Sequence, residues 1–165
     1  MLLLWQIIWY IALFVGVLTF IEKNDKKCLH LNVAVCFLWA THYFLLWLPA
    51  ASYILVSDGV KSILAVKYKG NIALLLLLLV WNVCIWRYTF DGTLSSLLPV
   101  TTSTIWTIWV FLSAWLMMRF VFLLVVSIWL TYNCISFSLP AIVSNLITLW
   151  AVIVWLFRVY RGKKS

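Results

Sequence analysis

Seven long apolar stretches make up almost the whole chain, and only short polar segments separate them. They cover residues 2–21, 29–48, 50–66, 72–86, 94–118, 120–138 and 141–160. A helix needs about 20 mostly apolar residues to cross the hydrocarbon core of a bilayer, and fewer where the membrane is locally thinned. The pattern therefore predicts seven transmembrane helices.

The composition excludes a water-soluble domain. Of the 165 residues, 67% are hydrophobic and 10% are charged, whereas a soluble domain carries roughly 25% charged residues. Too few polar side chains are present to cover a surface in water. We expect an all-α integral membrane protein, a single membrane domain over residues 1–165 whose surroundings are the lipid bilayer.

The basic residues predict the orientation of these spans. Of the 12 Lys and Arg residues, Arg87 alone falls on the side of the N-terminus, and Lys61 lies within a span. The others fall on the opposite side: Lys23, Lys26, Lys27, Lys67, Lys69, Arg119, Arg158, Arg161, Lys163 and Lys164. Cytoplasmic loops carry the excess of Lys and Arg, so we expect the N-terminus outside and the C-terminus in the cytoplasm.

Several chemistries are not supported by the sequence. The four cysteines form no CxxC pair, and His30 and His42 are about 18 Å apart in height on one helix, too far to share a metal ion. No basic stripe with stacking aromatics outside the spans suggests nucleic acid. No phosphate-binding loop or paired catalytic carboxylates occur. We expect no enzyme activity, no cofactor, no metal and no nucleic acid partner.

Two similar junctions indicate an internal repeat. Leu-Pro-Ala joins the second and third spans at 48–50, and again the sixth and seventh at 139–141. Seven residues before each proline lies a polar residue, His42 in one case and Asn133 in the other. We expect two parallel three-helix repeats, at 1–66 and 94–161, joined by a linker helix at 72–86. Parallel repeats of this kind occur in SWEET transporters, although two such turns in a leucine-rich chain can also arise by coincidence.

Polar residues within the spans are the candidates for a binding site, because an ionisable group in the bilayer is costly unless it is paired or hydrated. Asp58 and Lys61 share a helix face at the middle of the third span, and His42 lies at a similar depth. With Asn133 and Asn145 from the other half, they would line a central polar cavity that binds substrate. In the alternative, Asp58 and Lys61 neutralise each other, Lys61 extends toward the cytoplasmic side and His42 bonds between helices.

Hydroxyl side chains follow Pro99 in the fifth span, at 101–104 and at Thr107. Proline in a membrane helix frees backbone groups that Ser and Thr side chains can satisfy. We therefore expect these hydroxyls mainly to repair the helix.

Short motifs over much of the chain carry a resemblance to a known family. They are Leu97-Leu98-Pro99-Val100, Thr107, Met118-Arg119, Trp129 and Asn133, and in the first half the segments 42–46, 49–50 and 54–55. In order and spacing this set resembles the YgjV-type bacterial inner-membrane family, over about 42–161. The sequence departs from the family pattern at Asp58, where an uncharged polar residue is familiar, and at Lys61, where arginine is.

The resemblance implies a multi-pass protein of the bacterial inner membrane, in a family without an established activity. The layout of three, one and three helices is also similar in topology to SWEET, PQ-loop and PnuC transporters. We therefore expect a transporter or facilitator for a small polar metabolite. The alternative is a membrane protein that transports nothing and binds a partner protein or lipid. The sequence leaves open whether the protein forms a homo-oligomer.

Overall fold

The computed structural model describes residues 2–22, 24–112 and 115–162. Within these residues the chain is all-α, with seven α-helices, one short 3-10 helix and no strand. The elements are α1 (Leu2–Ile21), α2 (Asp25–Leu45), α3 (Pro49–Tyr68), α4 (Ile72–Thr89), η1 (Leu94–Ser96), α5 (Leu97–Leu112), α6 (Trp115–Ile135) and α7 (Leu139–Gly162). The prediction of seven helices is confirmed.

One predicted boundary is wrong. The fifth span was expected to continue to Met118 and the sixth to begin at Phe120, but α5 ends at Leu112 and α6 begins at Trp115. Residues 115–118, assigned from the sequence to the fifth span, therefore belong to α6. No glycine, proline or charged residue lies in the sequence between Leu112 and Phe120 except Arg119. The isolated charge of Arg119, which suggested a loop, lies instead in the first turns of α6.

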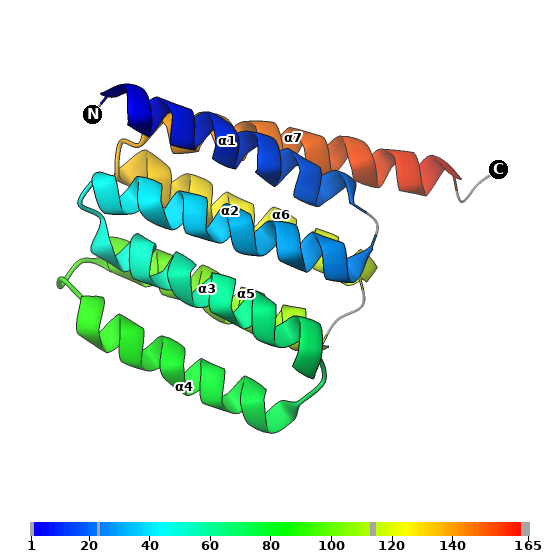
Figure 1. Cartoon of the computed structure of the whole chain (residues 1–165), viewed down its shortest axis with the longest axis horizontal. Helices are drawn as coiled ribbons and strands as arrows, with labels where there is room; N and C mark the ends of the chain where they lie inside the picture. The colour runs from blue at the N-terminus through cyan, green and yellow to red at the C-terminus, as the bar shows by residue number, and fades with distance from the viewer. Residues whose placement is uncertain (1, 23, 113–114, 163–165) are drawn as a thin grey trace.

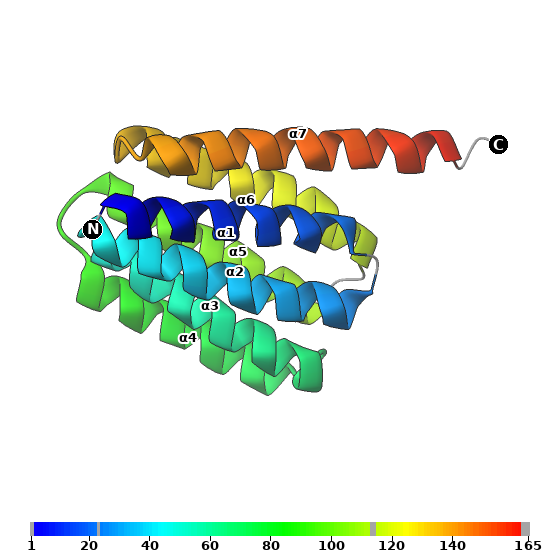
Figure 2. The same cartoon turned by 45° about the horizontal axis from the view of Figure 1, so that its top comes forward.

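The helices form two layers that lie face to face (Figure 1). In one layer α2 packs between α1 and α3; in the other α6 packs between α5 and α7. The layers meet where α1 contacts α7 and where α3 contacts α5, and α4 lies at the edge against α3 and α5. Figure 2 shows the same arrangement after a turn of the molecule, with the two chain ends at opposite ends of the bundle.

Large apolar side chains cover the outside of the bundle, as a bilayer environment requires. Phe14, Leu77 and Trp150 each expose more than 60% of their surface. By length and composition, three helices among the described residues can cross a membrane: Lys26–Leu45, Ile72–Thr89 and Leu139–Phe157. Shorter apolar helices occupy Ile7–Thr19, Leu97–Leu112 and Phe120–Ile135. The helical part of the chain therefore has the character of a multi-pass membrane protein.

The turns after α2 and α6 have the same backbone geometry. Each ends its helix with an aromatic residue in the left-handed conformation, Trp47 at φ 56° and Phe137 at φ 53°. The N–H of the next residue then reaches back to a carbonyl in the last turn, Leu48 to Tyr43 at 3.0 Å and Ser138 to Asn133 at 3.1 Å. This six-to-one bond is the mark of a Schellman motif.

The two turns are 90 residues apart, one residue less than the interval between Pro49 and Pro140. Tyr43 and Asn133 hold the same place in the two motifs and are 90 residues apart. Pro49 is the first residue of α3, whereas Pro140 is the second residue of α7. Matching the two prolines paired Asn133 with His42, but the turn pairs it with Tyr43.

Candidate functional site

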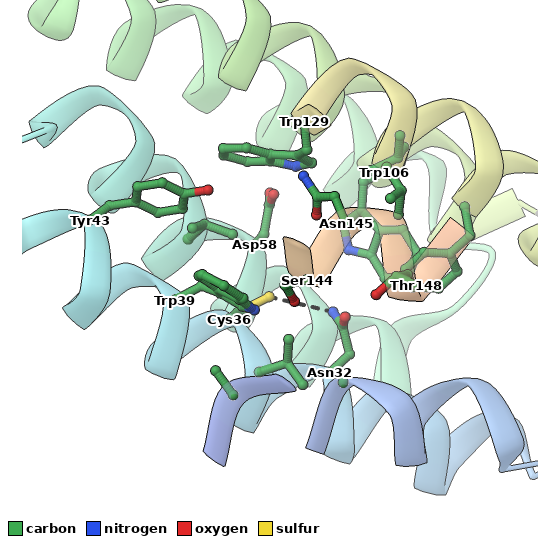
Figure 3. Close-up of a pocket in the computed structure, with 17 residues that line it drawn as sticks. Asn32, Cys36, Trp39, Tyr43, Asp58, Trp106, Trp129, Ser144, Asn145 and Thr148 are labelled. Atoms are coloured by element: carbon green, nitrogen blue, oxygen red, sulfur yellow. Dashed lines mark hydrogen bonds between the residues drawn. The ribbon is translucent and has the colours of Figure 1, made fainter. Parts of the chain in front are cut away.

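A cavity of about 120 Å³ lies between the two layers of helices. Its lining residues come from α1, α2 and α3 and from α5, α6 and α7; within the described residues α4 supplies none. Figure 3 shows the polar and aromatic side chains that face one another there. The cavity is therefore a product of the interface between the two groups of three helices.

The cavity lies between two packed apolar clusters. One contains Cys36, Tyr43 and Leu55, with Trp39 and Trp129 packed against it. The other is built from residues such as Leu29, Trp106, Phe122 and Val126. Members of both clusters line the cavity, which therefore interrupts the core at the depth where Asp58 lies.

Asp58 is bound on its far side by an ion pair. Lys61, one turn further along α3, places its Nζ 2.9 Å from Oδ1 of Asp58, as the three-residue spacing predicted. Ser103 of α5 donates a hydrogen bond to the same oxygen. Lys61 is fully buried, so the alternative in which it extends toward the cytoplasmic side is wrong.

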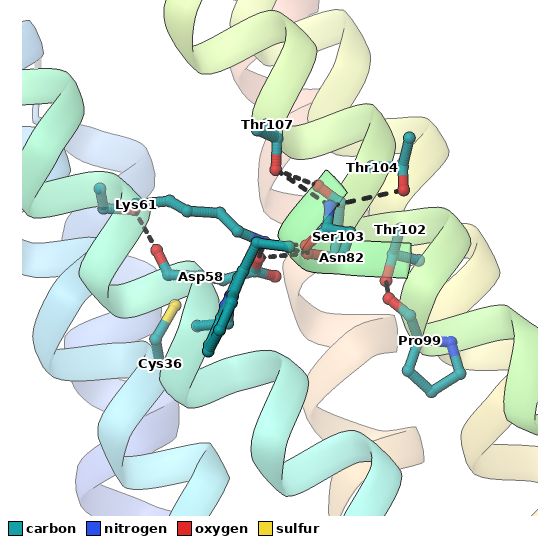
Figure 4. Close-up of polar contacts among 12 residues, drawn as sticks. Cys36, Asp58, Lys61, Asn82, Pro99, Thr102, Ser103, Thr104 and Thr107 are labelled. Carbon is teal, nitrogen blue, oxygen red and sulfur yellow. Dashed lines mark hydrogen bonds and ion pairs between the residues drawn. The ribbon is translucent and has the colours of Figure 1, made fainter. Parts of the chain in front are cut away.

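Lys61 connects three helices (Figure 4). Its Nζ also donates to Oδ1 of Asn82 on α4, and to Oγ of Ser103 at 2.6 Å. The Asn82 amide in turn donates to Thr107 and Thr104 of α5, at 3.4 Å and 3.5 Å. A buried ion pair is stable only if further hydrogen bonds satisfy both charges, and here side chains of α4 and α5 supply them.

The wall of the cavity is less completely paired. Asn145 and Ser144 of α7 line it together with Thr148. Among the described residues, the Nδ2 of Asn145 and the Nε1 of Trp106 are buried donors without a hydrogen-bond partner. Such donors are rare in folded proteins and call for an explanation.

His42 and Asn133 lie near the Schellman turns, at the end of the cavity. The Tyr43 hydroxyl, a cavity residue, donates to Oδ1 of Asn133 at 2.7 Å. His42 is fully buried, and its Nε2 lies 3.5 Å from Oγ of Ser138 at the start of α7. Both residues therefore join α2 to the opposite layer.

Of the five predicted site residues, the structure places two in the cavity wall and three beside it. Asp58 and Asn145 line the cavity. Lys61 lies behind Asp58, and His42 and Asn133 lie at the turns.

Several residues that shape this region were not predicted as site residues. Asn82, an isolated amide in a leucine-rich span, is a partner of Lys61, and its position within a predicted span was an available signal. Tyr43, Trp39 and Trp129 supply aromatic walls. Asn32, also in the wall, donates to Ser62 of α3 at 3.0 Å.

The hydroxyls after Pro99 have two roles. Thr101, Thr102 and Thr107 donate to backbone carbonyls of their own helix, at Leu97, Pro99 and Ser103. None of these is the carbonyl of Ser95, to which the missing N–H of Pro99 would donate, so helix repair at Pro99 stays a prediction. Ser103 binds Asp58 instead, and Thr104 accepts from Asn82. The residues of the run that face α3 and α4 therefore belong to the ion-pair network.

Many residues that line the cavity form pairs separated in sequence by the same number of residues as the two turns. Tyr43 and Asn133 are 90 residues apart, and the same interval joins other positions that line the cavity. These pairs are Gly16 and Trp106, Asn32 and Phe122, Val35 and Val125, Cys36 and Val126, Trp39 and Trp129, Leu55 and Asn145, and Asp58 and Thr148.

Comparison with known proteins gives the family. A family model described as bacterial inner membrane protein, Imp-YgjV, matches residues 3–163, so the chain belongs to this family. The resemblance predicted from the short motifs is confirmed. No curated protein and no solved structure matches the chain.

Proposed function

We propose that this member of the Imp-YgjV family of bacterial inner membrane proteins is a facilitator or transporter for a small molecule, which binds in the cavity between the two layers. The observation that carries the proposal is the cavity itself, lined by six helices with Asp58 and Asn145 in its wall. Ligand sites typically combine apolar walls with a few placed polar groups. In a membrane protein, an ionisable residue at such a place is a functional hypothesis by default.

The recurring interval of 90 residues supports an internal repeat of α1–α3 and α5–α7, with α4 as the linker. Two parallel repeats related by an axis along the membrane normal would place matching residues around a shared central site. The lining positions paired at 90 residues and the two similar turns support this arrangement. Rocking of one unit against the other would then expose the cavity alternately to the two sides of the membrane.

The proposed orientation has the N-terminus outside. Lys26, Lys27, Lys67 and Lys69 lie at the end of the bundle where α7 ends, and Arg87 lies at the other. The predictions at Lys23, Lys163 and Lys164 fall outside the described residues. In intact cells, a membrane-impermeant thiol reagent should label Thr93→Cys and leave Lys26→Cys unlabelled, in a background without the native cysteines. The opposite pattern would reverse the orientation.

Flux into liposomes tests the proposed function. We expect purified protein to carry at least one compound from a panel of sugars, amino acids, vitamins and small heterocycles, and Asn145→Leu to reduce that flux at least tenfold. Trp150→Leu, a change on the lipid-facing side of α7, is the matched control and should leave flux unchanged. Flux that Asn145→Leu does not alter would remove the cavity from the transport path.

One observation favours the alternative of a lipid-binding protein without transport. A groove of about 700 Å³ between α3 and α4 is lined almost entirely by apolar side chains, including Val56, Leu77 and Trp81. In a bilayer, acyl chains are the available molecules that fit an apolar groove. Specific lipid retained through purification, together with no flux for any compound, would favour this function.

A further inference from the structure

The cavity limits the size of a ligand. Its volume is about 120 Å³, and an engineered protein cavity of roughly 150 Å³ holds one benzene molecule. The cavity is somewhat smaller than one that holds benzene, so a compound with a single ring is the largest ligand that we expect to enter it, with small adjustments of the lining side chains. A nucleoside or a disaccharide is too large for it.

Aromatic rings form much of the cavity wall. Tyr43 stacks on Trp129, with ring centroids 5.7 Å apart and 19° between the planes, and Trp39 lies 6.0 Å from Tyr43. Trp106 packs against Phe122 at 5.0 Å in the other cluster. Aromatic faces favour flat partners that stack with an offset or meet them edge to face. The walls therefore favour a planar ring over a puckered one.

The charge in the cavity wall is already balanced. Asp58 is the charged residue among the described lining residues, and its carboxylate lies 2.9 Å from the buried ammonium of Lys61. A cationic ligand would have to compete with Lys61, and an anionic one would meet the carboxylate in a region of low dielectric. An uncharged ligand avoids both costs.

Hydrogen-bonding groups in the wall are complementary to a ring with both donor and acceptor atoms. Lys61 and Ser103 both bind Oδ1 of Asp58, and Figure 3 shows Asp58 among the residues that line the cavity, together with Trp39 and Trp129. The buried donors of Asn145 and Trp106 have no partner in the described residues. A ligand N–H can donate to Asp58, and a ligand carbonyl can accept from Asn145 or Trp106.

We infer that the cavity binds a small, uncharged, planar heterocycle with one ring that carries N–H donors and carbonyl acceptors, a cyclic amide. The inference rests on the proposed function and names the substrate class of the same cavity. Stacking on Trp39 and Trp129 would fix the plane of the ring. Asp58 on one edge and Asn145 on another would fix its rotation in that plane.

Binding measured on the full-length protein in lipid nanodiscs tests this class. The probes are uracil and 2-pyridone as cyclic amides, toluene as an apolar ring, benzoate as an anionic ring and glucose as a polar compound that is not planar. We expect at least one cyclic amide to bind, and to bind at least tenfold more tightly than the other three probes. Trp129→Leu should weaken this binding about tenfold, since stacking on an aromatic side chain contributes at that level.

Two controls keep the test interpretable. Trp150→Leu removes a tryptophan that is 68% exposed on α7 and should not change binding. Asn145→Leu should weaken the cyclic amide much more than toluene, because it removes a donor and keeps the branched shape of the side chain. Glucose or benzoate binding more tightly than both cyclic amides would overturn the substrate class, as would the absence of binding by both amides. If neither amide binds but another compound is transported and its flux depends on Asn145, the substrate class is wrong and the proposed transport function is retained.

Discussion

The two sides of Asp58 differ in how their polar groups are paired. On the side of α4 and α5, Lys61, Asn82, Ser103 and Thr107 form a buried network in which side chains bind one another. On the side of the cavity, the buried donors of Asn145 and Trp106 lack partners within the described residues.

This difference separates a structural role from a binding role. Paired polar groups hold helices together, and breaking one pair leaves the other member buried and unsatisfied. A buried donor without a partner costs the folded state about 1–3 kcal/mol, and a ligand that brings an acceptor can satisfy it. The ion-pair network therefore has a structural role and the neighbouring cavity wall has a binding role. Asp58 belongs to both groups.

The largest expected effect follows from removing the charge of Lys61. Lys61→Met leaves Asp58 as an uncompensated buried carboxylate, and loss of one partner of a buried pair costs about 3–5 kcal/mol. We expect this loss in the free energy of unfolding, measured by chemical denaturation in detergent. The double variant Asp58→Asn/Lys61→Met should recover most of it. A single variant as stable as the wild type would show that the network does not hold the helices.

Replacing asparagine with leucine on each side of Asp58 tests the difference between the network and the cavity wall. Asn82→Leu removes an amide that accepts from Lys61 and donates to Thr107, and should cost about 1–3 kcal/mol of unfolding free energy. Asn145→Leu removes a buried donor that has no partner, so it should leave the unfolding free energy unchanged or raise it by up to about 1–3 kcal/mol. Equal losses in the two variants, measured under one denaturation protocol, would erase the distinction between network and wall.

A smaller effect is expected where the two layers meet near the turns. Tyr43→Phe removes the 2.7 Å hydrogen bond to Asn133, and a neutral hydrogen bond contributes about 1 kcal/mol net. Thermal unfolding should show a modest destabilisation. Tyr88→Phe, at a tyrosine that is 81% exposed, is the control and should have no effect. A Tyr43→Phe protein with wild-type stability would show that this contact does not join the layers.

The smallest expected effect concerns the loop after α4, outside the membrane. Hydrogen bonds from Thr93 lower the pKa of Asp91 below its usual value. An aspartate whose pKa is lower in the folded protein than in the unfolded chain, where it is about 3.9, stabilises the folded protein. This stabilisation is complete above the unfolded-chain pKa and is lost as the pH falls through the folded-state pKa. Because Asp91 is exposed, solvent screens this contribution and we expect it to be small. Wild type should therefore be slightly more stable than Asp91→Asn at neutral pH, and the difference should vanish as the pH falls below the folded-state pKa of Asp91. A difference of the same size at neutral and at low pH, measured by denaturation across this pH range, would contradict the assignment.

Much of the fold could be predicted because helix length and apolar content follow directly from the bilayer. All seven helices were predicted, and the spacing of Asp58 and Lys61 predicted their ion pair. Residues 115–118 were assigned to the fifth span rather than to α6, because no change in polarity separates them from the residues of α5.

The candidate site was harder to predict, because its members come from different helices. Asp58 and Asn145 were found as polar residues inside apolar spans, and both line the cavity. The tryptophans were not assigned to the site. In the sequence, a tryptophan within an apolar span looks the same whether its side chain faces lipid or a cavity. Trp39 and Trp129 recur at the interval of the turns, but matching Pro49 with Pro140 shifted the two halves by one residue and concealed this relation.

Filling the cavity tests the central claim most directly. Gly16 of α1 lines the cavity, and a Cβ added there would meet no other atom within 4 Å. Leucine also replaces glycine in a helix with a gain of up to about 1 kcal/mol, so Gly16→Leu should fold normally. Ala73→Leu adds bulk to the exposed side of α4, away from the cavity, and is the matched control.

The decisive measurement is flux into liposomes for these two variants beside the wild type, for whichever compound the wild type carries. We predict that Gly16→Leu abolishes flux while its unfolding temperature equals or exceeds that of the wild type, and that Ala73→Leu retains full flux. Full flux through a stable Gly16→Leu protein would contradict the assignment of the cavity as the substrate site.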